Sequence, residues 1–186
     1  MHAAAVVAPA GSAWLLIGPT GSGKSTLAYA LSRAGWGVLG DDGVIVGDTL
    51  GGGRLFAIGW HDPVRVSIRL AGAFPELGSD NVRAQVMSGD ARERTTIDIS
   101  PPRPAPIAGL VWVTHGTRDA MVKRSPTEAL ADLVRDSAWV LIADEWARPH
   151  LAALRQLVTS VPSFALTHSA AQLTRIGDTL QSASNE

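Results

Sequence analysis

The chain contains no cysteine among its 186 residues, which excludes a disulfide framework and any metal site built on thiolates. It also has no excess of charge of either sign, because its net charge at pH 7 is −1. A global basic field that would hold nucleic acid is therefore missing, and we expect no nucleic-acid partner. Apolar residues make up 46% of the chain, which is typical of globular proteins. The length suits a single domain over residues 1–186.

The N-terminal part lacks both a basic start and a long hydrophobic run. Lys24 is the first basic residue, whereas a secretory signal peptide begins with a basic region. The apolar runs at residues 3–8 and 13–17 are separated by Pro9 and Gly11, so neither is long enough to span a bilayer. We therefore expect no membrane partner and a cytoplasmic location.

Strand-like and helix-like patterns alternate along the chain, which indicates an α/β fold. The two early apolar runs predict two strands joined by a turn. Residues 25–35 predict a helix with Gly35 at a left-handed C-cap. Further strands are predicted within residues 37–48, 65–70, 107–113 and 163–168, and further helices at 148–158 and 169–181.

A helix start is marked at Ser125. This residue suits an N-cap, Pro126 suits the first helical position, and Glu128 stands where a capping box needs it.

Residues 18–25 read Gly-Pro-Thr-Gly-Ser-Gly-Lys-Ser, which matches the phosphate-loop pattern G-x-x-x-x-G-K-[ST]. An apolar strand leads into this stretch and a helix leaves from Ser25, as the motif requires. The glycines let backbone N–H groups surround phosphate oxygens, and the helix N-terminus adds partial positive charge. We predict that the phosphates of a nucleotide are bound by Gly18, Pro19, Thr20, Gly21, Ser22, Gly23, Lys24, Ser25 and Thr26.

Two side chains of the loop have specific predicted roles. Lys24 would reach the β- and γ-phosphates of ATP, and the hydroxyl of Ser25 would bind Mg²⁺. The alternative is a glycine-rich turn with an accidental lysine.

Asp41 and Asp42 follow the loop helix closely. If the strand before them lies beside the first strand, both carboxylates face the γ-phosphate. One acid could then hold the magnesium ion through water, while the other accepts the proton from an attacking hydroxyl. Because Asp and Gly favour turns, a solvated Gly-Asp-Asp-Gly turn is the alternative.

The stretch from His2 through the loop to Asp42 resembles the catalytic domain of HPr kinase/phosphorylase and its shorter relatives. In that group a His-containing strand precedes the phosphate loop and an Asp-Asp pair follows the loop helix. The pair is also similar to the kinase-2 motif of ATP-dependent phosphoenolpyruvate carboxykinases, which share the nucleotide-binding core. The resemblance is strongest over residues 1–48 and continues within residues 61–70, 107–134 and 163–180. It implies a P-loop core of this type, with a mixed sheet flanked by helices.

The resemblance also implies roles for single residues. Lys24 and Ser25 become the phosphate and metal residues, Asp41 the proton acceptor and Asp42 the metal partner. His2 falls where the family has a histidine near the phosphates; an ordinary N-terminal strand residue is the alternative. Arg94 lies near a basic position of these relatives and could clamp phosphate or the acceptor; a solvated arginine is equally compatible.

The resemblance finally implies cofactors and partners. ATP and Mg²⁺ are the expected cofactors. Some relatives phosphorylate a precursor peptide on a serine hydroxyl, so the expected acceptor is a serine in a peptide or protein. The relatives often assemble, which implies a homo-oligomer. The irregular segment 71–95, which carries Arg83, Arg92 and Arg94, is interpreted as a flexible part that orders over the acceptor.

Two other functions fit the same motifs: a kinase for a small metabolite, and a non-kinase ATPase or nucleotide-sensing module. They differ in acceptor dependence. A peptide kinase consumes ATP slowly until peptide is added, a metabolite kinase responds to its metabolite, and an ATPase needs neither.

The other histidines and acids form no recognisable site. His61 and Asp62 are expected in a loop before Pro63. Asp144 and Glu145 follow an apolar run, but Asp41 and Asp42 already fill the acidic role. No metal-ligand spacing connects the remaining histidines His115, His150 and His168.

Overall fold

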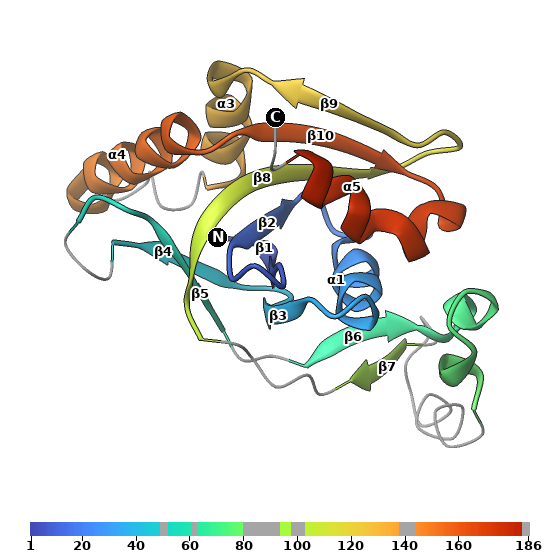
Figure 1. Ribbon diagram of the computed structural model, residues 1–186. Coiled ribbons are helices and arrows are strands. Elements are labelled where there is room, and N and C mark those ends of the chain that lie inside the picture. The colour runs from blue at the N-terminus through green and yellow to red at the C-terminus, as the bar shows by residue number, and fades with distance from the viewer. Residues whose placement is uncertain (49–51, 61–62, 80–93, 98–102, 138–143, 184–186) are drawn as a thin grey trace.

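The computed structural model describes residues 1–48, 52–60, 63–79, 94–97, 103–137 and 144–183. Within these residues one mixed sheet is covered by helices on both faces (Figure 1), so the expected α/β class is confirmed. The strands of the sheet are β1 (Ala3–Val7), β2 (Ala13–Ile17), β3 (Gly37–Gly40), β4 (Val44–Gly47), β5 (Phe56–Gly59), β8 (Ala105–His115), β9 (Ala120–Arg124) and β10 (Ser163–His168). The helices are α1 (Lys24–Arg33), α3 (Pro126–Asp136), α4 (Asp144–Ser160) and α5 (Ile176–Ala183).

The sheet order is β3-β1-β2-β8-β10-β9, with the β4–β5 hairpin joined to the beginning of β8. Strands β2, β8 and β10 run parallel, whereas β1 is antiparallel to both β2 and β3. The carboxyl ends of β2, β3, β8 and β10 therefore meet the amino end of β1 at one edge of the sheet. Strand β9 pairs antiparallel with β10 at the far side.

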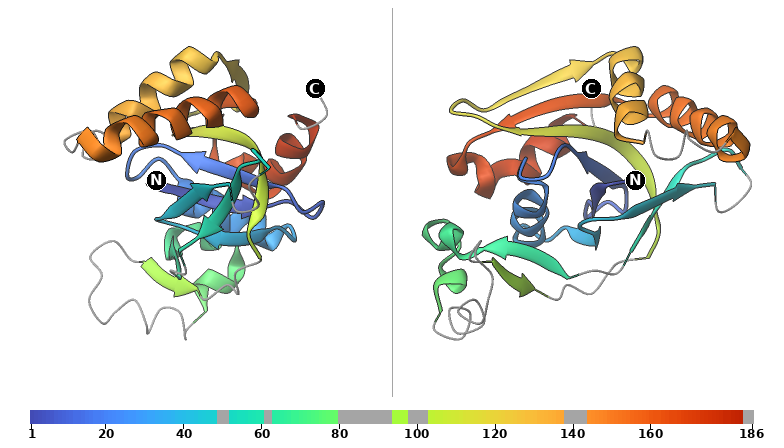
Figure 2. Two further views of the ribbon diagram at one scale, coloured as in Figure 1. Left: turned by 90° about the vertical axis from the view of Figure 1, so that its left-hand side faces the viewer. Right: turned by 180° about the vertical axis from the view of Figure 1, so that it is seen from behind.

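The central strand β2 is buried on both faces, and this explains its uninterrupted apolar sequence. Its residues point alternately to the two faces. Trp14 and Leu16 pack in a cluster with α1 and α5. Leu15 and Ile17 pack in a second cluster with α3 and α4. Figure 2 shows the sheet between these two pairs of helices.

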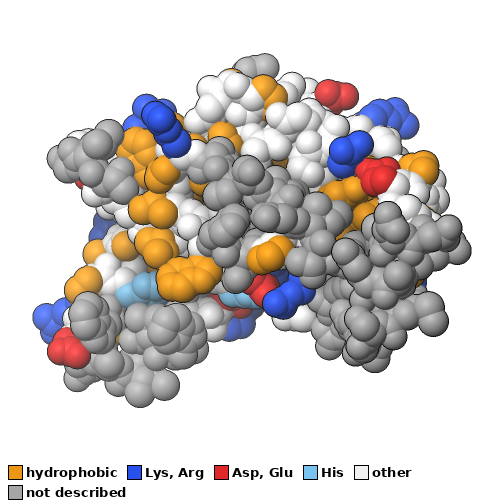
Figure 3. Space-filling model, turned by 90° about the horizontal axis from the view of Figure 1, so that it is seen from below, with side chains coloured by type: hydrophobic (Ala, Val, Ile, Leu, Met, Phe, Trp, Pro, Cys, Tyr) orange, Lys and Arg blue, Asp and Glu red, His pale blue; other side chains and the backbone are white. Residues whose placement is uncertain are grey.

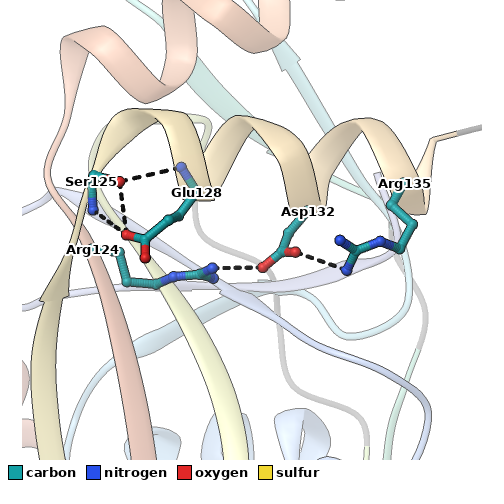
Figure 4. A network of polar contacts seen from close by, with 5 residues as sticks. All are labelled: Arg124, Ser125, Glu128, Asp132 and Arg135. Carbon is teal, nitrogen blue, oxygen red and sulfur yellow. Dashed lines mark hydrogen bonds and ion pairs between the residues drawn. The ribbon is translucent and has the colours of Figure 1, made fainter.

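Helix α3 begins with the predicted capping box, which is confirmed (Figure 4). The Ser125 hydroxyl accepts the Glu128 amide proton at 3.3 Å, and the Glu128 carboxylate accepts the Ser125 amide proton at 2.9 Å. Further along, Arg124 and Arg135 both donate to Asp132, at 2.7 and 2.9 Å. These bonds satisfy amides that have no partner within the helix and join the end of β9 to α3.

The strand predicted at residues 65–70 ends earlier than expected. Strand β6 (Val64–Ser67) pairs with β7 (Arg94–Ile97) in a separate two-stranded ribbon. The Ser67 hydroxyl then accepts the amide proton of Arg69 at 3.3 Å, and the chain turns into the 3₁₀ helix η1 (Ile68–Gly72). A serine side chain that bonds the backbone two residues ahead competes with strand pairing.

Two helix boundaries also differ from expectation. The helix predicted at 148–158 begins already at Asp144 and contains Pro149. The helix predicted at 169–181 is divided into the 3₁₀ helix η4 (Ala170–Arg175) and α5. Gly35 has the expected left-handed conformation, with φ 86°.

Of the segment 71–95, the structure describes residues 71–79, which include the 3₁₀ helix η2 (Pro75–Gly78), and the start of β7. The rest of this segment lies outside the described residues, as do His61 and Asp62. No helix among the described residues is long and apolar enough to cross a bilayer.

Replacing Ser125 by Ala should lower the free energy of unfolding by about 1 kcal/mol, because the substitution removes the side-chain acceptor at the helix start. Urea unfolding followed by circular dichroism measures this change. Ser160→Ala, at the exposed end of α4, is the matched control and should have little effect. Equal midpoints for Ser125→Ala and the wild type would contradict a contribution of the capping box.

Candidate functional site

One edge of the sheet gathers polar side chains from several distant parts of the chain. His2 precedes β1, the Gly-rich loop follows β2, Asp41 and Asp42 follow β3, and β8 and β10 each end in a histidine. At this edge lies a cavity of about 600 Å³, lined by His2, Thr20, Gly21, Gly23, Lys24, Ser25, Thr26, Asp42, Arg65, Ser67 and His115. In Figure 3, histidine, acidic and basic side chains gather near the middle of one face, beside hydrophobic side chains.

The loop between β2 and α1 needs its glycines for both conformation and space. Gly18, Gly21 and Gly23 have φ angles of 150°, 86° and 100°, a region that side chains disfavour. A Cβ atom on Gly18 would also lie 2.9 Å from the Val113 carbonyl oxygen, and one on Gly23 would lie 2.7 Å from His168 Nε2. Gly23 is the N-cap of α1, so the helix begins directly at this crowded point.

Lys24 is buried, with 6% of its surface exposed. Its ammonium donates to the carbonyl oxygens of Gly18 at 2.7 Å and Pro19 at 3.1 Å. Burial lowers the pKa of Lys24, while the charges of Asp42 and Asp41 act in the opposite direction. The ammonium is thus held at the mouth of the loop, close to two carboxylates.

His2 connects this lysine to the acidic pair. Its Nε2 lies 3.2 Å from Lys24 Nζ, and its Nδ1 lies 3.2 Å from the carbonyl oxygen of Asp42. An ammonium can only donate and a carbonyl can only accept. In the tautomer with its proton on Nδ1, the ring donates to the carbonyl oxygen and accepts from the ammonium. His2, which the resemblance expects near the phosphates, thus lies beside Lys24.

Asp41 is a buried carboxylate, with 5% of its surface exposed. Burial raises its pKa, and hydrogen bonds from Ser25 and from the Arg65 amide partly offset that rise. The Arg65 amide lies 3.4 Å from Oδ2. Oδ1 is buried and has no hydrogen-bond partner among the described residues. Within the described part of the chain, Asp41 therefore has one acceptor oxygen without a partner.

Asp42 has a different environment from its neighbour. Its side chain is 59% exposed, and Oδ1 lies 3.7 Å from Nδ1 of His2. Strand β3 does lie beside β1, the first strand. Of the two acids, Asp42 lines the cavity, whereas Asp41 is buried and accepts a hydrogen bond from Ser25. The two carboxylates that were expected to face the γ-phosphate therefore differ in burial, and that expectation stays a prediction.

The β6–β7 ribbon supplies a cation that the sequence reading missed. Arg65 and Ser67 line the cavity, whereas Val64 and Val66 are buried in the core beside α1. The alternation of polar and apolar residues in β6 could have revealed this face. The backbone of Arg94 pairs with Ser67 at the end of the ribbon.

Two histidines that look unrelated in sequence lie together in the structure. The β8–β10 register places His115 opposite His168, and their ring centroids are 4.6 Å apart. His115 is exposed and lines the cavity, whereas His168 is 1% exposed. Both strands end in Thr-His after an apolar run. In parallel neighbouring strands, that repetition could have predicted the contact.

Among the residues that the structure describes, no three His, Asp or Glu side chains converge as a metal-ligand group. The two residues predicted to bind a metal, Ser25 and Asp42, both line the cavity.

Comparisons with known proteins found a similarity in structure but none in sequence. No family model matches the chain, and no curated protein matches it in sequence. Among solved structures, the chain is similar to the Hpr(Ser) kinase/phosphatase from Coxiella burnetii. The two share 11% sequence identity with a TM-score of 0.47, over 100% of this chain and 95% of that chain.

Replacing Asp41 by Asn should raise the melting temperature at pH 7. Folding raises the pKa of Asp41, so the acid favours the folded state when protonated and opposes it once ionised. This contribution is complete below the unfolded pKa of about 3.9 and is lost as the pH rises through the folded pKa. The advantage of the variant should therefore shrink as the pH falls toward 4.

Differential scanning calorimetry between pH 4 and 8 measures this effect; for a chain of this size, each kcal/mol corresponds to roughly 2–4 °C. Asp178→Asn on the exposed surface of α5 is the control. A lower melting temperature for Asp41→Asn at pH 7 would mean that the fold stabilises the ionised carboxylate.

Proposed function

We propose that this chain is an ATP- and Mg²⁺-dependent kinase, with an HPr-kinase-like core, that transfers the γ-phosphate to a serine hydroxyl of a peptide or protein. The observation that carries the proposal is the position of Asp41. A buried carboxylate with a raised pKa lies against Ser25 of the phosphate loop, close to the charge of Lys24. A general base works best when its pKa lies near the operating pH.

The loop supports binding of a phosphate chain. Left-handed glycines at Gly21 and Gly23 expose backbone amides without side chains in the way, and α1 begins at Lys24. Successive amides and a helix N-terminus favour anions. Lys24 adds a full positive charge at the same place. The cavity of about 600 Å³ lies within the volume range of small-molecule and cofactor pockets.

The residues present also fit Mg²⁺. This ion prefers oxygen ligands and usually takes only one or two from protein, with water and substrate phosphates completing its shell. Asp42 offers an exposed carboxylate in the cavity. Ser25 donates a hydrogen bond to Asp41, which leaves an oxygen lone pair for the metal. When bound, Mg²⁺ would neutralise charge on the β- and γ-phosphates.

The transfer itself needs few groups. As the serine oxygen bonds to the γ-phosphorus, its proton passes to Asp41, and the bond from that phosphorus to the bridging oxygen breaks to leave ADP. Lys24 and the loop amides stabilise the charge on the phosphate oxygens. Arg65, which lines the cavity from β6 and whose amide bonds to Asp41, would add a second cation to the site. His2 orients Lys24 and Asp42 through its two ring nitrogens.

The kinase reaction is tested by mass spectrometry of a serine-containing peptide pool incubated with the protein, ATP and Mg²⁺. Wild type should produce phosphopeptides, and Asp41→Asn should lower the rate on the order of 10²-fold or more, because it removes the proton acceptor. Asp178→Asn is the matched control. Consumption of ATP without phosphopeptides would direct the search to a metabolite acceptor or to hydrolysis.

The same assay separates the roles of the two acids. Asp42→Asn should raise the Mg²⁺ concentration needed for half-maximal rate, whereas saturating Mg²⁺ should not rescue Asp41→Asn. If added Mg²⁺ instead rescues Asp41→Asn, Asp41 is the metal ligand and not the proton acceptor.

Arg65→Gln should lower the turnover rate on the order of 10²-fold with little change in ADP affinity, since the guanidinium acts where charge develops during transfer. Steady-state kinetics and calorimetric ADP titration measure the two quantities. Arg118→Gln, on the exposed turn after β8, is the control. An unchanged turnover rate would exclude Arg65 from the reaction.

A further inference from the structure

The paired histidines His115 and His168 form a contact with the phosphate loop that the proposed chemistry does not use. They stand at the carboxyl ends of β8 and β10. In the strand order these two strands lie on one side of β2 and its loop, whereas β3, which precedes the acidic pair, lies on the other side. The strand register alone brings the two rings together.

Backbone and side-chain hydrogen bonds surround the pair. The Gly116 amide donates to the His168 carbonyl oxygen at 3.1 Å, and the hydroxyls of Thr114 and Thr167 lie 3.3 Å apart. Beyond His168, the Ser169 amide donates to Asp119 at 2.7 Å. Each histidine therefore lies beside residues that are bonded across the two strands.

Both rings lie directly against Gly23. A Cβ atom at that glycine would lie 2.7 Å from His168 Nε2 and 2.8 Å from His115 Cε1. Gly23 precedes Lys24 and caps α1, so the pair touches the loop at the start of the helix. The two rings leave no room for this segment to shift toward β8 and β10.

The two histidines differ in what they can reach. His168 is buried, and neither of its ring nitrogens has a hydrogen-bond partner of ordinary geometry among the described residues. Burial and the neighbouring His115 lower its pKa, while the backbone of Ser22 and of Ser169 acts in the opposite direction. His115 is exposed to the cavity that Lys24 and the loop also line.

We infer that His115 is a phosphate-binding residue of the nucleotide site and that His168 is the positioning residue that holds its ring against Gly23. This inference rests on the proposed function, because it needs a nucleotide in the cavity. The imidazole N–H of His115 donates to a phosphate oxygen, and such a bond to a charged acceptor is stronger than one between neutral groups. His168 acts by filling the space behind that ring.

Calorimetric titration with ADP and with pyrophosphate, without added Mg²⁺, tests the first part. His115→Leu should weaken both on the order of 10-fold, because it removes a hydrogen bond to a charged group. His150→Leu, on α4 outside the cavity lining, is the control and should bind as wild type does. Wild-type affinity in His115→Leu overturns the inference.

NMR signals of the histidine rings give a second readout that does not depend on turnover. The chain has five histidines, so ¹³C-labelled imidazole Cε1 signals can be assigned with single His→Gln variants. Saturation with ADP should shift the His115 signal and leave that of His150 unchanged. A His115 signal that does not move excludes a contact with the phosphates.

Variants of His168 test the positioning role. His168→Phe keeps the ring volume and should retain the ADP-induced shift of the His115 signal, whereas His168→Ala should abolish it. If His168→Ala does not fold, the result for His168→Phe alone tests the positioning role of His168. Loss of the shift in His168→Phe would mean that the ring nitrogens of His168, and not its volume, are required.

Lys24→Met separates this inference from the proposed function. If Lys24→Met abolishes ADP binding while His115→Leu does not affect it, only the role of His115 is wrong. If neither variant affects binding, the nucleotide site itself is wrong.

Discussion

The parallel alignment of β2, β8 and β10, with β1 and β3 beside them, is the constraint on which the site depends. It brings the ends of these strands to one edge of the sheet. The loop after β2 is therefore flanked by an acidic pair on one side and a histidine pair on the other. Ligands of α/β proteins bind at such an edge, beyond the carboxyl ends of the strands.

The site concentrates polar groups in a place where burial disfavours them. Lys24, Asp41 and His168 are each at least nine-tenths buried. Burial lowers the pKa of Lys24 and His168 and raises that of Asp41, so it favours the neutral form of each side chain. The apolar clusters on the two faces of the sheet supply the stability that offsets this cost. Such an arrangement is expected where groups must be ready for proton transfer and for binding of charge.

Much of the fold was predictable because its patterns are local. The loop pattern at residues 18–25, the cap at Ser125 and the apolar runs of β2 and β10 each follow from neighbouring residues. The end of β6 was missed, because a single hydroxyl–amide bond at Ser67 decided it.

The site was predictable only where its residues are close in sequence. Lys24, Ser25, Asp41 and Asp42 lie within one short stretch, and the structure brings them together with His2. Arg65, His115 and His168 come together through strand pairing over long separations, for which the sequence offers only indirect signals: the alternation in β6 and the Thr-His endings of β8 and β10. The different burial of Asp41 and Asp42 has the same origin, since it follows from the position of β3 beside β1 and from the packing of β6.

The central claim is that the loop and Asp41 direct a phosphoryl group to a hydroxyl rather than to water. ATP labelled with ¹⁸O on its γ-phosphate, incubated with the protein, Mg²⁺ and the peptide pool, tests this most directly by mass spectrometry. A kinase transfers the labelled oxygens to phosphoserine in a peptide, and this transfer should disappear in Asp41→Asn. Label found only in free inorganic phosphate, at a rate unaffected by peptide or metabolite mixtures, would contradict the account and identify an ATPase.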